Sequence, residues 1–174
     1  RDGVLSTAQS FTSSTLSIGI HTITFDVRDE TGTWSDPVTE TVYVGTKVID
    51  NRDAAVSSTG TWAQSSGANP YGVDSVWSRD GATFTFEIST TGSGYYDLWM
   101  WWTDYSSRGS EIPLDISHAN GTDREYVNQQ SDGGQWNYMG TYQFQQDVVY
   151  PTTIISQPYP ASTCADAVMI TPAG

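Results

Sequence analysis

The stretch Gly94–Asp104, which reads Gly-Tyr-Tyr-Asp-Leu-Trp-Met-Trp-Trp-Thr-Asp, constrains the fold more than any other part of the sequence. Four of its large apolar residues, spaced two apart, lie on one side of the strand: Tyr96, Leu98, Met100 and Trp102. Successive side chains of a β-strand point to opposite faces of the sheet, so this set predicts the core face of a strand. The other side carries Asp97, Trp99 and Trp101 in place of a plain polar row. Such a face either binds a ligand or is covered by a second layer of protein.

The composition of the remaining chain also favours an all-β fold. Among the 174 residues, Gly, Ser, Thr, Trp and Tyr are frequent, and no stretch keeps a helical period. The formal net charge is −13, and Lys47 is the one lysine. A negative charge of this size repels nucleic acids and anionic membranes, so it argues against both as partners. No apolar run reaches the length of a membrane span, so we expect no membrane insertion. Without an initiator methionine, Arg1 is expected to follow processing or truncation.

Cys164 is the one cysteine of the chain, so neither an intrachain disulfide nor a cysteine cluster for a metal can form. We expect its side chain to be a small buried hydrophobe near the C-terminus rather than a reactive thiol.

Residues 1–45 predict a partial domain of their own. Two alternating strands, Ile18–Val27 and Pro37–Val44, flank the turn signal Asp29–Gly32. This hairpin resembles the C-terminal half of an immunoglobulin-like bacterial surface repeat of the PKD or Big type. A seven-stranded sandwich needs about 100 residues, so the segment leaves a sheet edge and an apolar face uncovered.

Residues 46–174 predict a second β domain, built from short alternating segments separated by turns such as Asn120-Gly121. From 48 to 171 this unit resembles the golvesin C-terminal-like domain, which also occurs at the C-termini of bacterial xanthan lyases. The matching residues are Ile49-Asp50-Asn51, Gly60-Thr61-Trp62, Gly94-Tyr95-Tyr96, His118-Ala119-Asn120-Gly121-Thr122, Gln129-Gln130, Gly134-Gln135-Trp136, Met139-Gly140-Thr141-Tyr142 and Ala165-Asp166-Ala167-Val168. The resemblance implies a jelly-roll-like β-sandwich that serves secreted enzymes and surface proteins as a non-catalytic appendage. The Trp99/Trp101 pair and the loop 157–160 depart from it.

The sequence contains no recognisable catalytic constellation. Its two histidines, His21 and His118, both lie in strand patterns. There is no nucleophile elbow, no metal-spaced histidine pair and no phosphate loop. Carboxylates are spread along the chain without a distinctive pair, so we predict that this chain is not an enzyme.

The aromatic residues after position 98 give the candidate ligand site. Trp99, Trp101 and Tyr105 offer flat apolar rings that suit the C–H faces of sugars, and Asp104 and Arg108 are hydrogen-bonding neighbours. The alternative is that both tryptophans pack under a loop or against the N-terminal hairpin.

Two further positions carry lesser expectations. Asp50 and Asp166 lie near the first and last strands of the second domain, where they could hold a structural Ca²⁺ or accept hydrogen bonds from turn N–H groups. No other cofactor is expected. Asn120-Gly121-Thr122 is a hairpin turn that also fits the N-glycosylation acceptor pattern.

The leading functional hypothesis is a non-catalytic module of a secreted or cell-surface protein that binds a polysaccharide or another surface component. The competing hypothesis is a structural subunit of an extracellular assembly. In that case copies of the chain, or a host protein, would complete the N-terminal segment through its strand 38–44 or its segment 10–15, and the aromatic face would form the second half of the interface.

Overall fold

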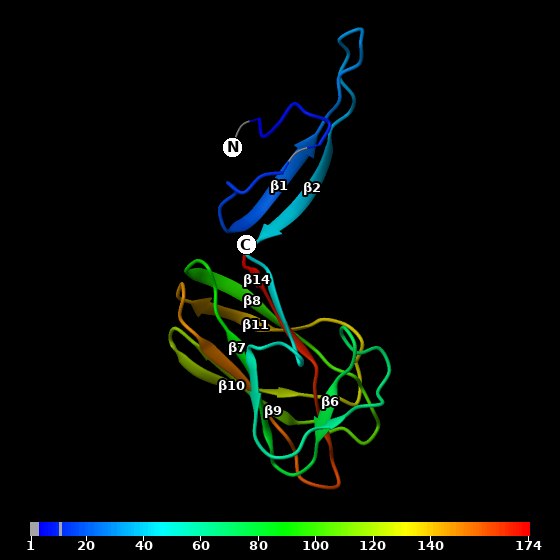
Figure 1. The fold of residues 1–174 in the computed structure, drawn as a ribbon, viewed down its shortest axis with the longest axis vertical. Coiled ribbons are helices and arrows are strands. Elements are labelled where there is room, and N and C mark those ends of the chain that lie inside the picture. The colour runs from blue at the N-terminus through cyan, green and yellow to red at the C-terminus, as the bar shows by residue number, and fades with distance from the viewer. Residues whose placement is uncertain (1–3, 11) are drawn as a thin grey trace.

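The computed structural model describes residues 4–10 and 12–174. These residues form strands, turns and loops with no helix, which confirms the predicted all-β class. Figure 1 shows a narrow N-terminal hairpin that projects from a larger, layered sandwich. Residues 1–3 and 11 of the predicted 1–45 domain lie outside the described residues.

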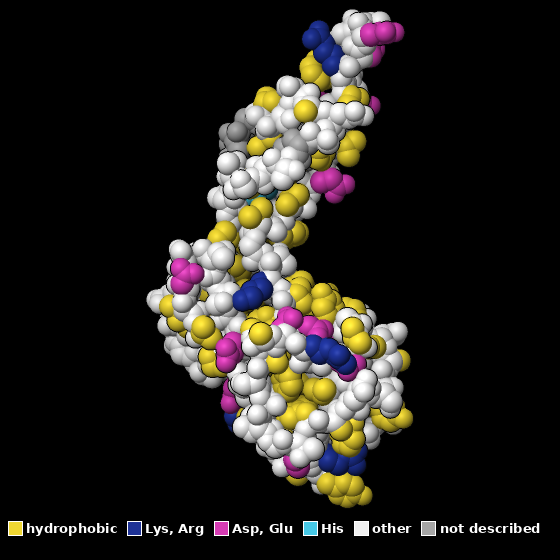
Figure 2. Space-filling view, in the orientation of Figure 1, with side chains coloured by type: hydrophobic (Ala, Val, Ile, Leu, Met, Phe, Trp, Pro, Cys, Tyr) yellow, Lys and Arg dark blue, Asp and Glu magenta, His cyan; other side chains and the backbone are white. Residues whose placement is uncertain are grey.

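The hairpin pairs β1 (Gly19–Phe25) with β2 (Val38–Val44) in an antiparallel two-stranded sheet. Its loop is held by Asp29, whose Oδ1 accepts hydrogen bonds from the backbone N–H groups of Thr31 and Thr33 at 2.9 and 2.8 Å. Neither strand contains a fully buried residue, and Phe25 remains 49% exposed. Figure 2 shows hydrophobic side chains scattered over the surface of this part of the molecule. The predicted strands are confirmed, whereas the immunoglobulin-like origin of the segment stays a prediction.

The sandwich consists of two main antiparallel sheets and a smaller one. A five-stranded sheet has the order β10-β9-β12-β7-β4, a four-stranded sheet the order β11-β8-β14-β3, and a three-stranded sheet the order β13-β6-β5. The strands are β3 (Lys47–Asp50), β4 (Val56–Ser58), β5 (Ala63–Gln64), β6 (Val76–Ser78), β7 (Thr83–Ile88), β8 (Gly94–Trp101), β9 (Ile112–His118), β10 (Gly121–Val127), β11 (Asn137–Phe144), β12 (Tyr150–Ile155), β13 (Thr163–Ala165) and β14 (Ala167–Pro172). The first strand of the sandwich, β3, pairs with the last, β14, so the two ends of the domain are joined.

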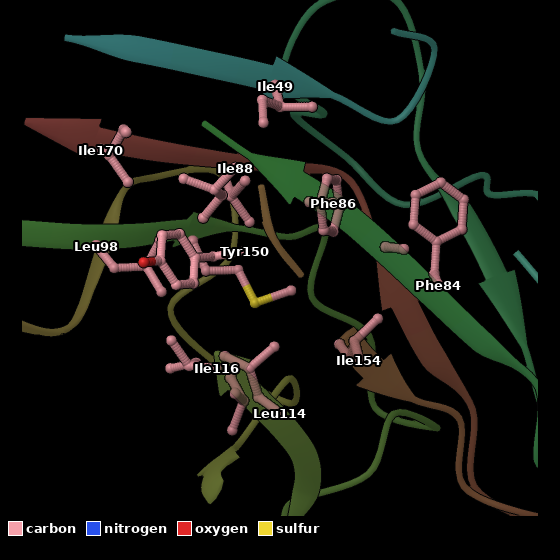
Figure 3. Packing of buried hydrophobic residues seen from close by; sticks show 14 of the residues in the cluster. Ile49, Phe84, Phe86, Ile88, Leu98, Leu114, Ile116, Tyr150, Ile154 and Ile170 are labelled. Carbon is pink, nitrogen blue, oxygen red and sulfur yellow. The ribbon is translucent and has the colours of Figure 1, made fainter. Parts of the chain in front are cut away.

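The core lies between the two main sheets, and its residues follow the strand alternation. The inward residues of β8 are at most 3% exposed, as the sequence predicted; they are Tyr96, Leu98 and Met100, with Trp102 just beyond the strand. Phe84, Phe86 and Ile88 of β7 face them from the opposite sheet (Figure 3). Burying a side chain of this size contributes about 1.5–3 kcal/mol, so these rows supply much of the stability of the sandwich. Cys164 is fully buried, as predicted.

A β-bulge interrupts the pairing of β11 with β8 between Tyr138 and Gly140. Tyr138 lies opposite Trp99, and Tyr142 lies opposite Tyr96. Tyr138 is 52% exposed, whereas Tyr142 is 7% exposed. The extra residue therefore reverses the alternation: the even-numbered residue Tyr138 lies on the outer face before the bulge, whereas Tyr142 and Phe144 lie on the core face after it.

The hairpin contacts the sandwich through a small apolar patch around Ile18. A Cβ atom on Gly92 would lie 2.5 Å from Ile18 Cδ1, which shows how closely this side chain approaches the β7–β8 turn. Ile18 also lies beside Gly45 and Pro172.

Candidate ligand-binding surfaces

The outer face of the four-stranded sheet carries a row of partly exposed apolar side chains, which we call the aromatic sheet face. It comprises Val48, Tyr71, Trp99, Trp101, Trp136, Tyr138 and Met169. Trp99 lies between Tyr138 on β11 and Met169 on β14, and the rings of Trp99 and Tyr138 meet edge to face at 5.2 Å. The indole N–H of Trp99 donates to Thr171 Oγ1 at 3.4 Å.

Polar groups border the Trp99 end of this face. The hydroxyl groups of Tyr138 and Thr141 are hydrogen-bonded at 2.7 Å, and the Thr141 hydroxyl donates to Asp97 Oδ1 at 2.5 Å. Thr141 is directly opposite Asp97 in the sheet. The face thus combines half-exposed rings with a fixed chain of hydrogen-bonding groups.

Trp101 packs against residues of two loops, contacts that the sequence pattern does not indicate. Its ring is edge-on to Tyr71 and Trp136, with centroid separations of 5.8 and 5.3 Å. Its indole N–H donates to the carbonyl of Asn69 at 3.0 Å. Trp101 therefore packs beside two loops, in line with the packing alternative, whereas Trp99 remains on the open sheet. No ligand role is predicted from sequence for Tyr71, Trp136 or Tyr138, because contacts between loops and a neighbouring strand leave no periodic signal.

Tyr105 and Arg108 belong to a different place. They line a cavity of about 170 Å³, which we call the arginine pocket, and its lining includes none of the tryptophans of the aromatic sheet face. The lining residues are Ser65, Ser66, Gly67, Trp77, Arg79, Tyr105, Ser107, Arg108 and Ser162. Asp104 is not among them; it packs against Gly133, where a Cβ atom would lie 2.4 Å from the Asp104 nitrogen. The candidate residues thus fall on two surfaces.

Arg108 is fixed by a buried polar network. It is 5% exposed and donates to the hydroxyl groups of Ser65 and Ser162 at 2.8 and 3.2 Å. Thr103 offers it a carbonyl and a hydroxyl oxygen, each at 3.4 Å. Burial lowers the pKa of Arg108, and the nearby positive charge of Arg79 acts in the same direction.

Asp50 and Asp166 lie close together at the seam between β3 and β14, where Asp50 pairs with Ala167. One oxygen of each accepts a backbone hydrogen bond: Asp50 Oδ1 from Arg52 at 3.0 Å, and Asp166 Oδ2 from Tyr71 at 3.2 Å. This matches the interpretation in which the carboxylates accept hydrogen bonds from turn N–H groups.

The remaining oxygens at this seam are buried without a partner in the described residues: Asp50 Oδ2, Asn51 Oδ1 and Asp166 Oδ1. Asp166 is 0% exposed, and its burial, with the charges of Asp50 and Asp74 nearby, raises its pKa to about 8. Among the described residues no group of three His, Cys, Asp or Glu side chains could hold a metal ion, and the unpartnered amide oxygen of Asn51 is a further side-chain oxygen beside the two carboxylates. Carboxylate and amide oxygens are the donors that Ca²⁺ prefers.

Asn120 occupies the turn between β9 and β10, as predicted, and is exposed. Its side-chain N–H donates to Gln143 Oε1 at 3.3 Å. Glycosylation at this position stays a prediction. Within the residues that the structure covers, no helix is long and apolar enough to cross a membrane.

These features define a class: a jelly-roll-like β-sandwich module with a partly exposed aromatic sheet face. Residues 47–172 match the family model of the Golvesin C-terminal domain, so the chain belongs to this family. It is 36% identical over 104 residues to a xanthan lyase of Bacillus sp. (strain GL1), a match that spans 56% of this chain and 11% of the lyase. The chain thus spans about a tenth of the length of that relative.

Solved structures show the same fold. A Paenibacillus xanthan lyase is similar with a TM-score of 0.72 and 29% identity, over 81% of this chain and 14% of the lyase. A family 35 carbohydrate binding module from Clostridium thermocellum is similar with a TM-score of 0.52 and 13% identity, over 72% of this chain and 98% of the module. At that identity the likeness establishes the fold of the module alone.

Proposed function

We propose that this chain is a non-catalytic, carbohydrate-binding module that works outside the cell as part of a larger secreted or cell-surface protein. The observation that carries the proposal is the pair of neighbouring rings on the aromatic sheet face, the partly exposed Trp99 and the 52% exposed Tyr138. The names of its relatives support it, because xanthan is a polysaccharide and several proteins of the same fold are carbohydrate binding modules.

The geometry of this face suits a sugar chain. Partly exposed indole and phenol rings offer apolar surface to the C–H groups of a sugar, and the hydroxyl groups of Tyr138 and Thr141 lie at their edge to meet sugar hydroxyls. The face belongs to a sheet rather than to a closed cavity. We therefore expect it to bind an extended polymer in preference to a free monosaccharide.

Affinity electrophoresis in gels that contain xanthan tests the proposal, with dextran as a second polymer. We expect xanthan to retard the wild-type chain and Trp99→Ala to weaken binding about tenfold or more, because truncating a central aromatic residue of an interface costs about 2 kcal/mol or more. Tyr138→Ala should weaken binding as well. The matched control is Trp34→Ala, which removes an exposed tryptophan of the hairpin.

Equal retardation of wild type and Trp99→Ala would remove the aromatic sheet face from the proposal. Retardation by no polysaccharide, shown on a glycan array as well as in gels, would overturn the proposed function itself. Circular dichroism of each variant separates loss of binding from loss of the fold.

We also propose that Asp50, Asn51 and Asp166 hold a structural Ca²⁺ at the β3–β14 seam. Three buried oxygens without partners in the described residues support this assignment; they lie at the end of β3 and just before the start of β14, the paired strands that close the domain. The ion would supply the positive charge that the buried Asp166 carboxylate needs, since a buried charge without a partner is costly.

The hairpin favours a second candidate function, contact with another protein. Phe25, Val27, Trp34 and Val38 are each at least 49% exposed, and the two-stranded sheet has unpaired edges. An uncovered edge and apolar side chains are a template for a partner strand. Light scattering over a range of protein and salt concentrations tests self-association, and a monomer under every condition would contradict assembly between copies.

A further inference from the structure

We propose that the arginine pocket binds a single carboxylate of an acidic sugar, so that the polysaccharide recognised by this chain is an anionic one. The proposal rests on the carbohydrate-binding function proposed above and names the substrate class of that function. It stands on the pocket's two arginines and not on the aromatic sheet face.

The pocket brings together two basic groups that have no acidic partner in the described residues, in a chain of 20 acidic and 7 basic residues. Within the same residues Arg28 and Lys47 also lack an acidic partner, but they donate to the carbonyl oxygens of Gly32 and Ser89. Arg52 forms an ion pair with Asp74, and Arg124 forms one with Asp115. In the described part of the chain, Arg79 and Arg108 have no such partner, and the pocket that both line contains no Asp or Glu.

Arg108 holds a positive charge at the base of this arrangement. Its hydrogen-bond acceptors are hydroxyl and carbonyl oxygens, and none is a carboxylate. A buried charge costs free energy unless an opposite charge accompanies it. An anion in the pocket would supply that opposite charge.

Arg79 adds the second positive group, and its orientation is restrained. Its guanidinium lies 4.6 Å from the centroid of the Trp77 ring and 5.7 Å from that of the Tyr159 ring. Its Nε is buried, so a ligand in the pocket would have to accept hydrogen bonds from the terminal NH₂ groups. A planar guanidinium that rests on an aromatic ring is suited to a carboxylate, which can accept two parallel hydrogen bonds from it.

The size and lining of the pocket fit one substituent of a sugar. Its volume of about 170 Å³ is well below the roughly 300–1,000 Å³ of pockets that enclose drug-sized ligands, so the sugar ring itself must lie largely outside. Ser66 and Ser107 contribute hydroxyl groups to the lining. Tyr105, which is 55% exposed, offers its ring to the body of the sugar.

The test compares three small probes by NMR titration and calorimetry on the full chain: sodium D-glucuronate, D-glucose and sodium acetate. We expect glucuronate to bind and to shift the indole N–H signal of Trp77, assigned with Trp77→Phe, while the signals of Trp99 and Trp101 stay in place. Glucose should leave all signals unchanged. Binding should weaken as salt is added, because charge–charge attraction is screened.

Arg79→Gln is the decisive variant, because Arg79 is only partly buried and its loss should leave the fold intact. We expect it to weaken glucuronate binding about tenfold or more, the usual effect of losing a charge-assisted hydrogen bond. Arg124→Gln is the matched control, since it changes the same residue type on β10, away from the pocket lining. Arg108→Gln should abolish binding and also lower stability.

The outcomes separate this inference from the proposed function. If glucuronate fails to shift Trp77, or if Arg79→Gln binds it as well as wild type, the pocket assignment is wrong, even when xanthan still binds through Trp99. If acetate binds as tightly as glucuronate, the assignment to an acidic sugar is wrong. If Arg79→Gln loses glucuronate while Trp99→Ala retains full affinity for xanthan, the pocket assignment stands and the aromatic sheet face is removed from the proposed function.

Discussion

The hairpin and the sandwich carry the same sequence pattern but differ in what the pattern accomplishes. In β1, Ile23 and Phe25 alternate with polar residues just as Phe84 and Phe86 do in β7. Phe25 is 49% exposed, whereas Phe84 is 5% and Phe86 0% exposed. The sandwich has a second sheet to cover each inward row, and the hairpin has only one sheet.

The difference shows that alternation specifies a strand and its two faces but not what covers them. An isolated two-stranded hairpin is marginally stable in water, because one hydrogen-bonded layer buries little apolar surface. The stability of this molecule should therefore reside in the sandwich. The following predictions test that division, beginning with the largest expected effect.

The largest effect is expected from matched phenylalanine substitutions in the two regions. Phe86→Ala should lower the free energy of unfolding of the sandwich by about 3–5 kcal/mol, because it leaves a cavity between the sheets. Phe25→Ala should change it by less than about 0.5 kcal/mol, as most surface substitutions do. Urea denaturation followed by tryptophan fluorescence measures both. Similar losses for the two variants would mean that the hairpin and the sandwich unfold as one unit.

The next effect concerns the β3–β14 seam. Added Ca²⁺ should stabilise the sandwich by about 2.7 kcal/mol when its concentration is a hundred times the Kd, and EDTA should reverse the gain. Asp166→Asn should remove the response, because it takes away one of the proposed ligands. Differential scanning calorimetry with Ca²⁺, Mg²⁺ and EDTA measures it, with Asp97→Asn on the outer face as the matched control. An unchanged melting temperature with every ion would contradict the cation site.

A smaller effect is expected when the hairpin is removed. A chain of residues 46–174 should fold, with a free energy of unfolding within about 1 kcal/mol of the full chain, since the contact around Ile18 covers only part of one apolar side chain. The far-ultraviolet spectrum and a urea titration measure this. An unfolded or aggregated 46–174 chain would show that the hairpin covers more of the sandwich than the Ile18 patch.

The smallest effect concerns the exposed pair Arg124–Asp115, whose two hydrogen bonds are 2.6 and 2.7 Å long. Arg124 lowers the pKa of Asp115, so the pair stabilises the fold above the ordinary carboxyl pKa and loses this contribution as the pH falls through the folded value. Arg124→Gln should cost at most about 1 kcal/mol at pH 7. The difference from wild type should shrink below pH 4 and in high salt. A difference that persists at low pH would point to lost packing instead.

The sequence predicted the core well, because burial on one face of a strand produces a period of two. Tyr96, Leu98 and Met100 were identified in this way, and the turn at Asn120 followed from its residue types. The candidate site was harder to predict. Trp101 meets Tyr71 and Trp136 through loops that are distant in the chain, and no periodicity records such contacts.

The separation of Trp99 from Arg108 has a similar cause. The chain leaves the sheet after Trp101, so residues a few positions apart turn toward different surfaces. Arg79 shares the arginine pocket with Arg108, but it precedes β7 in the sequence whereas Arg108 follows β8. No sequence pattern indicates that two residues so far apart in the chain line one pocket.

The bulge at Met139 has a consequence for how this family could diversify. Without Met139 the two strands would pair residue for residue, and Tyr138 and Tyr142, then three positions apart, would keep their places opposite Trp99 and Tyr96. With Met139 present, the bulge is what allows two residues four positions apart to lie on opposite faces of the sheet. A homologue could therefore lose this one residue and keep both faces, whereas a further one-residue deletion without a new bulge would turn either Tyr138 or the pair Tyr142 and Phe144 to the wrong face.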